Sequence, residues 1–224
     1  MIVLGLTGSI GMGKSTAAAM LRRLGCPVHD SDAAVHRLYA RGGAAVPVVA
    51  ALFPDAVRNG AVDRAALSAQ VVGRPEALRR LEAAVHPLVR ADADRFLRRA
   101  ARRRVKVAVL DIPLLFESRG EDRVDRIAVV SAPPSVQRAR VLARPGMGPA
   151  KLAAILALQM PDREKRRRAD FVVPTGLGRR HTLIALTRIV KMLGMERGRI
   201  WPPRGYRPLF PPRGTRPPRT PGRT

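Results

Sequence analysis

The stretch Gly8-Ser9-Ile10-Gly11-Met12-Gly13-Lys14-Ser15-Thr16 follows directly on an apolar run from residue 2 to residue 7. It has the spacing of a phosphate-binding loop, with a short buried strand before it and a helix after it. Its glycines let backbone N–H groups turn inward around phosphate oxygens, and the following helix adds the positive end of its dipole. Lys14 reaches the β- and γ-phosphates, and the Ser15 hydroxyl suits the magnesium ion that bridges them. The motif therefore predicts a nucleoside triphosphate site at Gly11, Met12, Gly13, Lys14, Ser15 and Thr16.

The length and composition of the chain favour a cytoplasmic globular protein. Its 224 residues are enough for one sizeable core with a subdomain. No apolar run approaches the roughly 18 residues of a membrane span, and the first one leads into the phosphate loop without a basic segment before it, unlike a signal peptide. The single cysteine, Cys26, excludes an intrachain disulfide, which suits a reducing compartment.

The net charge of +25 comes almost entirely from arginine. Abundant alanine, arginine, glycine and proline together are typical of proteins from GC-rich genomes. A non-specific attraction to polyanions is expected from such a charge, but an enzyme with acidic substrates also benefits from a positive field. The charge alone therefore predicts no specific nucleic-acid partner.

Four further segments are predicted to form short buried strands, and helical patterns lie between them. This alternation indicates an α/β protein with a parallel sheet flanked by helices. The predicted strands are 27–30, 105–111, 126–130 and 171–173. The predicted helices are 14–24, a helix from about 33, 63–72, 75–84, one beginning at Pro87, 134–143, 149–159, 163–168 and 181–195, the last with Leu183, Ile184, Leu186, Ile189 and Val190 facing inward. Residues 32–104 are longer than a simple crossover and are expected to form a helical insertion.

The C-terminal segment differs in composition from the rest of the chain. Residues 201–224 contain eight prolines and six arginines and no acidic residue. We expect a disordered basic tail over residues 197–224. Its aromatic residues Trp201, Tyr206 and Phe210 lie among arginines, a composition that also suits stacking on RNA bases.

Two aspartates follow the second predicted strand. Ligands of open parallel sheets bind beyond the carboxyl ends of the strands, where the phosphate loop also lies. We predict that Asp32 accepts the proton of a substrate hydroxyl as it attacks the γ-phosphate, and that Asp30 orders the turn or holds magnesium through water. The alternative interpretation is that both carboxylates only cap the helix that begins near Ala33.

Two other groups of residues suit the same edge of the sheet. Asp111 ends an apolar strand, as does the carboxylate that orients magnesium in many nucleotide-binding proteins, and residues 114–116 after it predict a hydrophobic wall. Glu117 is expected to bind substrate or to cap a turn. Arg140 and Arg144 share a helix face, which predicts a polyphosphate clamp on a closing lid or, alternatively, a solvated face.

Taken together, these motifs resemble those of the dephospho-CoA kinase family. The matching elements are, in order, residues 7–16, Asp30-Ser31-Asp32, His86-Pro87-Leu88-Val89, residues 111–117, Gln137 with Arg140 and Arg144, and Gln159 with Lys165 and Ala169-Asp170. The resemblance covers residues 2–196. It implies a P-loop kinase fold with a five-stranded parallel sheet, a helical substrate-binding insertion and a lid. It also implies that ATP, with Mg²⁺, phosphorylates the ribose 3′-hydroxyl of dephospho-CoA.

The resemblance also assigns roles to residues. It implies that Asp32 and Lys14 are catalytic and that Arg140 and Arg144 bind ATP together with residues 11–16. It further implies acceptor contacts from Asp32, His86, Leu115 and Glu117, and magnesium held by Ser15 and, through water, by Asp111. The nucleotide-binding core would comprise residues 1–31 and 105–196 with a lid at about 144–168, and the substrate domain residues 32–104.

The chain departs from the family pattern after its last strand. The family usually has an asparagine before the next glycine, whereas this chain has Pro174-Thr175-Gly176. Proline supplies no side-chain amide, so the adenine or phosphate contact at this point is left to backbone groups. Two other functions compete with the one that the resemblance implies: another small-molecule P-loop kinase, and an RNA-binding P-loop ATPase that uses the basic surface and tail.

Overall fold

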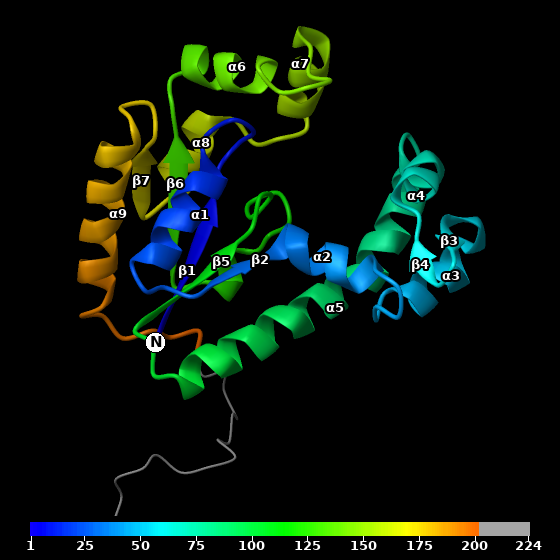
Figure 1. Cartoon of the computed structure of the whole chain (residues 1–224), viewed down its shortest axis with the longest axis horizontal. Coiled ribbons are helices and arrows are strands. Elements are labelled where there is room, and N and C mark those ends of the chain that lie inside the picture. Colours follow the sequence, from blue (N-terminus) through cyan, green and yellow to red (C-terminus); the bar gives the residue numbers. More distant parts are fainter. Residues whose placement is uncertain (202–224) are drawn as a thin grey trace, which may run out of the picture.

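Five parallel strands form the central sheet of the protein, in the order β2-β5-β1-β6-β7 (Figure 1). The computed structural model describes residues 1–201, so Tyr206, Phe210 and most of the predicted tail lie outside the described residues. The strands are β1 (Ile2–Thr7), β2 (Val28–Asp30), β5 (Val107–Asp111), β6 (Arg126–Ser131) and β7 (Phe171–Pro174). The predicted α/β class and all five predicted strands are confirmed.

Successive residues of β1 enter different hydrophobic clusters. Ile2, Leu4 and Leu6 pack in one cluster with helices α1 (Lys14–Arg23) and α9 (Arg179–Leu193). Val3 packs in a second cluster, which contains residues of helix α5 (Pro75–Arg102). The sheet is therefore covered on both faces, which explains why its strands are continuous apolar runs.

The buried stripe of α9 differs from the predicted one. Its buried residues are Thr182, Leu186, Ile189 and Leu193, which recur at intervals of three or four residues. Leu183 and Ile184, predicted to face inward, are 39% and 41% exposed. They lie next to this stripe, so apolar character alone did not indicate which side of the helix is buried.

The insertion between β2 and β5 has a hydrophobic cluster of its own, which includes Phe53, Leu67 and Leu81. Its elements before α5 are α2 (Ser31–Tyr39), α3 (Val46–Leu52), a 3₁₀ turn at Pro54–Ala56, β3 (Val57–Arg58), β4 (Ala61–Val62) and α4 (Arg64–Val71). Helix α3 and the β3–β4 hairpin were not predicted from the sequence. Asn59 and Gly60, which connect its strands, both have positive φ angles (53° and 74°), as expected for an Asn-Gly hairpin turn.

Helix α5 is continuous through Pro87, so the prediction that one helix ends near Ala84 and another begins at Pro87 was wrong. Proline removes one helical hydrogen bond, but tertiary packing overrides this local preference. Val85, before the proline, is buried in the cluster of the insertion, and Leu97, after it, is buried in the second cluster of the sheet.

A buried polar group joins α5 to the core. The imidazole Nε2 of His29, on β2, lies 3.0 Å from Oδ2 of Asp92, on α5. Arg37 of α2 donates to the same carboxylate oxygen at 2.8 Å. Although burial acts to raise it, the pKa of Asp92 is lowered to about 2 by its hydrogen bonds from His29, Arg95 and Arg37.

The remaining helices follow β6 and lie beside the carboxyl ends of the strands (Figure 1). They are α6 (Pro134–Leu142), α7 (Pro149–Ala157) and α8 (Asp162–Arg168), and a short 3₁₀ turn, η2 (Glu121–Arg123), precedes β6. Within residues 1–201 no helix is both long and apolar enough to cross a membrane.

The described residues that follow α9 pack against the core. The backbone N–H groups of Arg199 and Ile200 donate to Oδ1 of Asp125. Trp201 is only 6% exposed and belongs to the second hydrophobic cluster. The tail prediction was therefore wrong for residues 197–201, and the Trp201 side chain is not available to stack on RNA bases. Composition could not reveal this packing, because it depends on which part of the core the chain reaches after α9.

Candidate active site

The phosphate loop connects β1 to α1 and lines a cavity of about 640 Å³. Gly11 has a φ of 76°, and a Cβ atom there would lie 2.5 Å from Cγ2 of Val141. A side chain at this position would therefore be strained and would collide with α6. No side chain caps the N-terminus of α1, so the first-turn N–H groups are left for a ligand.

Lys14 forms an ion pair with Asp111 beneath the loop. Its Nζ donates to Oδ1 of Asp111 at 2.6 Å, and the Asp111 side chain is almost fully buried. Burial raises the pKa of Asp111, and the ammonium group of Lys14 opposes that shift. Lys14 lines the cavity, whereas Asp111 lies behind it at the end of β5.

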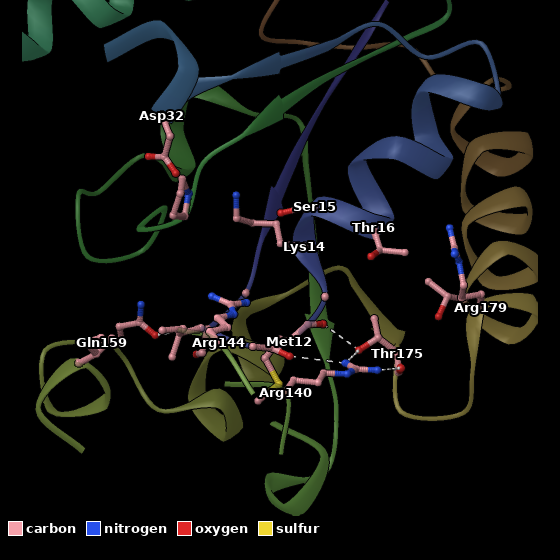
Figure 2. A pocket seen from close by; sticks show the side chains of 18 of the residues that line it. Met12, Lys14, Ser15, Thr16, Asp32, Arg140, Arg144, Gln159, Thr175 and Arg179 are labelled. Carbon is pink, nitrogen blue, oxygen red and sulfur yellow. Dashed lines mark hydrogen bonds between the residues drawn. The ribbon is translucent and has the colours of Figure 1, made fainter. Parts of the chain in front are cut away.

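Asp30 and Asp32 have different positions at the end of β2. Oδ1 of Asp30 accepts a hydrogen bond from the N–H of Ala33 at 2.9 Å, which makes Asp30 the N-cap of α2. Asp32 lies inside the first turn of α2 and lines the cavity (Figure 2). The interpretation that both aspartates cap the helix is therefore wrong for Asp32.

Arg140 is held against the phosphate loop by Thr175. The guanidinium group donates to the hydroxyl of Thr175 at 3.1 Å and to its backbone carbonyl at 2.7 Å. The same hydroxyl donates to the backbone carbonyl of Met12 at 2.7 Å, as Figure 2 shows. The residue before Gly176 thus contributes its side chain as well as its backbone, although it is not the usual asparagine.

Other residues complete the wall of this cavity. Arg144 lines it together with Arg140. Arg144 lies just beyond α6, which ends at Leu142 with Ala143 as its C-cap, so the two arginines do not share a helix face as expected. Ile155, Arg179 and Thr182 also line it, although no role was predicted for them from the sequence. Arg179 begins α9 just after β7, so the rule that ligands bind beyond the carboxyl ends of strands could have indicated it.

A second cavity of about 450 Å³ lies beside the helical insertion. Its apolar wall is formed by α2, α5 and the loop after β5, and its polar lining includes His86, Glu117 and Arg123. Asp32 and Pro113 line this cavity and the phosphate-loop cavity alike. The Asp32 carboxylate therefore lies where a nucleotide in one cavity would meet a phosphoryl acceptor in the other.

Similarity to known proteins identifies the family of this chain. A family model described as dephospho-CoA kinase matches residues 2–177. The chain belongs to the dephospho-CoA kinase family. A dephospho-CoA kinase of Mesorhizobium japonicum is 60% identical over 198 residues, which are 88% of this chain and all of the relative. The dephospho-CoA kinase of Paramagnetospirillum magneticum is 61% identical over 197 residues, covering 88% of this chain and 93% of the relative. A solved structure from Thermus thermophilus, 39% identical, superposes with a TM-score of 0.77 over 85% of this chain and 96% of the other.

The loop after β5 positions one of the expected acceptor contacts of this kinase, Leu115, differently from the prediction. Leu115 has no exposed surface and packs in the second hydrophobic cluster, where its Cδ2 lies beside Gly5 of β1. Leu114, which is 44% exposed, lines the second cavity instead. In a turn, apolar character does not determine which side chain points to the core, so the expectation that the Leu115 side chain faces the acceptor was wrong.

Glu117 lines the second cavity, and Lys165 and Met160 also bind its carboxylate. Its Oε1 lies 2.8 Å from Nζ of the fully buried Lys165 and accepts from the N–H of Met160 at 2.8 Å. Burial acts to raise the pKa of Glu117, but Lys165 and the backbone N–H groups hold it below its usual value. Glu117 is therefore an anion in this kinase, tied to the segment that carries α8.

Proposed function

We propose that this kinase transfers the γ-phosphoryl group of ATP to the ribose 3′-hydroxyl of dephospho-CoA, which yields CoA and ADP. Its family and its relatives named dephospho-CoA kinase support this reaction. The observation that carries the proposal is the position of Asp32 at the boundary between a phosphate-loop cavity and a second, largely apolar cavity.

The phosphate-loop cavity supplies the donor site. Backbone N–H groups of the loop and of the first turn of α1 would bind the phosphates, and Lys14, Arg140 and Arg144 would oppose their charge. Stabilisation of the charge on the transferring phosphoryl group is the main task in this chemistry. Lys14, Arg140 and Arg144, which line the same cavity, are suited to that task.

The second cavity supplies the acceptor site, and the helical insertion, residues 32–104, is the acceptor domain. Dephospho-CoA combines apolar parts with a diphosphate group. Val35, Tyr39 and Leu114 offer apolar surface, and Arg90 and Arg123 offer positive charge in the same cavity. Residues 144–168, which include α7 and α8, form the lid over the donor site.

Asp32 accepts the proton of the 3′-hydroxyl as the oxygen attacks the phosphoryl group. The Ser15 hydroxyl, which lines the cavity, fits a magnesium ion, whereas the buried Asp111, whose Oδ1 pairs with Lys14, would act on that ion only through water. Within residues 1–201 no cluster of three or more acidic, histidine or cysteine side chains is poised to hold a metal. A magnesium ion bound mainly by the phosphates of ATP would neutralise part of their charge.

The proposal is tested by ADP release with and without dephospho-CoA. We expect release that depends on dephospho-CoA and is unaffected by RNA. Asp32→Asn should lower kcat by about 10²–10⁴-fold and leave ATP affinity unchanged, because the amide keeps the shape but takes no proton. Asp30→Asn is the matched control, since asparagine also caps helices well and should cost little.

Two outcomes would contradict the proposal. ADP release that RNA stimulates and dephospho-CoA does not would favour an ATPase. Normal turnover by Asp32→Asn, with loss of turnover by Asp30→Asn, would show that the base is assigned to the wrong residue.

A further inference from the structure

The peptide groups on either side of Ile10, in the middle of the phosphate loop, are bound by two glutamine side chains. Oε1 of Gln159 accepts from the backbone N–H of Ile10 at 3.1 Å. Nε2 of Gln137 donates to the backbone carbonyl of Ile10 at 2.8 Å. A backbone N–H only donates and a carbonyl only accepts, so the orientation of both side-chain amides is fixed.

These glutamines come from the segments after β6 that line the donor site. Gln137 lies on α6 and is 8% exposed, and Gln159 lies in the short connection between α7 and α8. Residues of α6 and of this connection therefore determine where the backbone of Ile10 lies. The neighbouring N–H groups of the loop are those proposed to bind the phosphates of ATP.

The same connection also reaches the acceptor side. Met160, the next residue after Gln159, donates its backbone N–H to Glu117, and Lys165 of α8 pairs with the same carboxylate oxygen. Glu117 lines the acceptor-side cavity, and Gln159 lines the donor-side cavity. Gln159 thus binds the phosphate loop at the donor site, and the adjacent Met160 binds the loop after β5 at the acceptor site.

We propose that Gln137 and Gln159 are positioning residues for the phosphate loop, and that the α7–α8 connection couples the two substrate sites. Movement of Glu117 on acceptor binding shifts Met160, and with it the Gln159 side chain that holds Ile10. Each substrate then binds more tightly when the other is present, because both favour the same arrangement of this connection. The identity of the acceptor rests on the proposed function, whereas the hold on Ile10 does not.

The hold on Ile10 is tested by amide hydrogen exchange without nucleotide. Gln159→Leu removes the acceptor and should speed exchange of the Ile10 amide at least tenfold. Gln159→Glu keeps an acceptor oxygen and should preserve the protection. Gln137→Glu replaces the amide donor with a carboxylate oxygen, which cannot donate to the Ile10 carbonyl. Gln137→Glu should therefore perturb the loop, whereas Gln159→Glu should not. Fast exchange at Ile10 in the wild-type protein, or unchanged exchange in Gln159→Leu, would refute this part.

Coupling between the sites is tested by calorimetry with a non-hydrolysable ATP analogue, with and without dephospho-CoA. In the wild-type protein we expect the analogue to bind about 5–150-fold more tightly when dephospho-CoA is present. Gln159→Leu should reduce this ratio to less than about twofold. Leu158→Ala is the matched control, because this neighbouring side chain is 83% exposed and lies outside the residues that line the donor cavity.

The outcomes separate this inference from the proposed function. A wild-type protein that does not bind dephospho-CoA would refute the proposed function, and the exchange of Ile10 would still test the positioning role. If dephospho-CoA binds but does not alter the affinity for the analogue, or if Gln159→Leu keeps the full ratio, the coupling is refuted.

Discussion

Replacing Thr175 with valine removes a hydroxyl group while it keeps the shape of the side chain. Thr175 is 6% exposed, and its hydroxyl joins the phosphate loop to Arg140 through bonds of 2.7 Å to the Met12 carbonyl and 3.1 Å to the guanidinium. The Arg140 group that loses its partner lines an open cavity and can bind water. Met12 is buried, so its carbonyl group is left without the hydrogen bond from Thr175 in a buried position. This lost hydrogen bond determines the free-energy cost of the substitution.

An unpaired buried polar group costs about 1–3 kcal/mol. For a protein of this size, that free energy corresponds to about 2–4 °C in Tm for each kcal/mol, or about 2–12 °C in total. Arg140 keeps its 2.7 Å bond to the Thr175 carbonyl and therefore stays in the cavity. We expect kcat/KM for ATP to fall by no more than about 150-fold, which corresponds to the upper limit of about 3 kcal/mol.

Differential scanning calorimetry and steady-state kinetics measure the two effects. Thr175→Ser is the matched control, because serine keeps the hydroxyl and should retain both the Tm and the kcat/KM of the wild type. A valine variant with unchanged Tm and unchanged kcat/KM would show that the hydroxyl bonds to Met12 and Arg140 contribute nothing. A serine variant as impaired as the valine variant would show that the lost methyl group, and not the hydroxyl, matters.

Three further changes test other parts of the site and the fold. Lys14→Ala should remove most turnover while the protein stays folded by circular dichroism, because the transferring phosphoryl group loses a cation; near-normal turnover would contradict the assigned site. Asp92 has a pKa lowered to about 2, so its bonds to His29 and to two arginines should stabilise the fold above about pH 4 and lose this effect as the pH falls toward 2; denaturant titrations should show that Asp92→Asn loses stability at pH 7 but little at pH 2. Deletion of residues 202–224 removes six arginines and should preserve ADP release with dephospho-CoA, whereas a folded but inactive product would make this segment part of the enzyme.

The strands and the phosphate loop could be predicted because their patterns are local. A run of apolar residues before a glycine-rich loop and a lysine is defined within about fifteen residues. The β3–β4 hairpin was also predictable from Asn59-Gly60, which was overlooked because its strands have only two residues each. The continuity of α5 through Pro87 could not be predicted, because packing at both ends of the helix overrides the local effect of proline.

Part of the site needed the three-dimensional arrangement. The sequence indicated that Asp32 lies near the phosphate loop, but only the structure separates it from Asp30, whose side chain caps α2. The sequence also could not determine that Leu115 points to the core beside Gly5 while Leu114 points to the cavity. Such choices depend on distant residues that share no pattern with the loop.

Helix α5 also has a consequence for how the protein unfolds. Leu81 and Val85 belong to the hydrophobic cluster of the insertion, whereas Ala93 and Leu97 belong to the second cluster of the sheet. Unwinding this one helix removes part of both clusters, so the two parts share one cooperative unfolding unit. A destabilising substitution deep in the insertion therefore also reduces the fraction of molecules with a folded phosphate loop, although no residue of that cluster belongs to the loop.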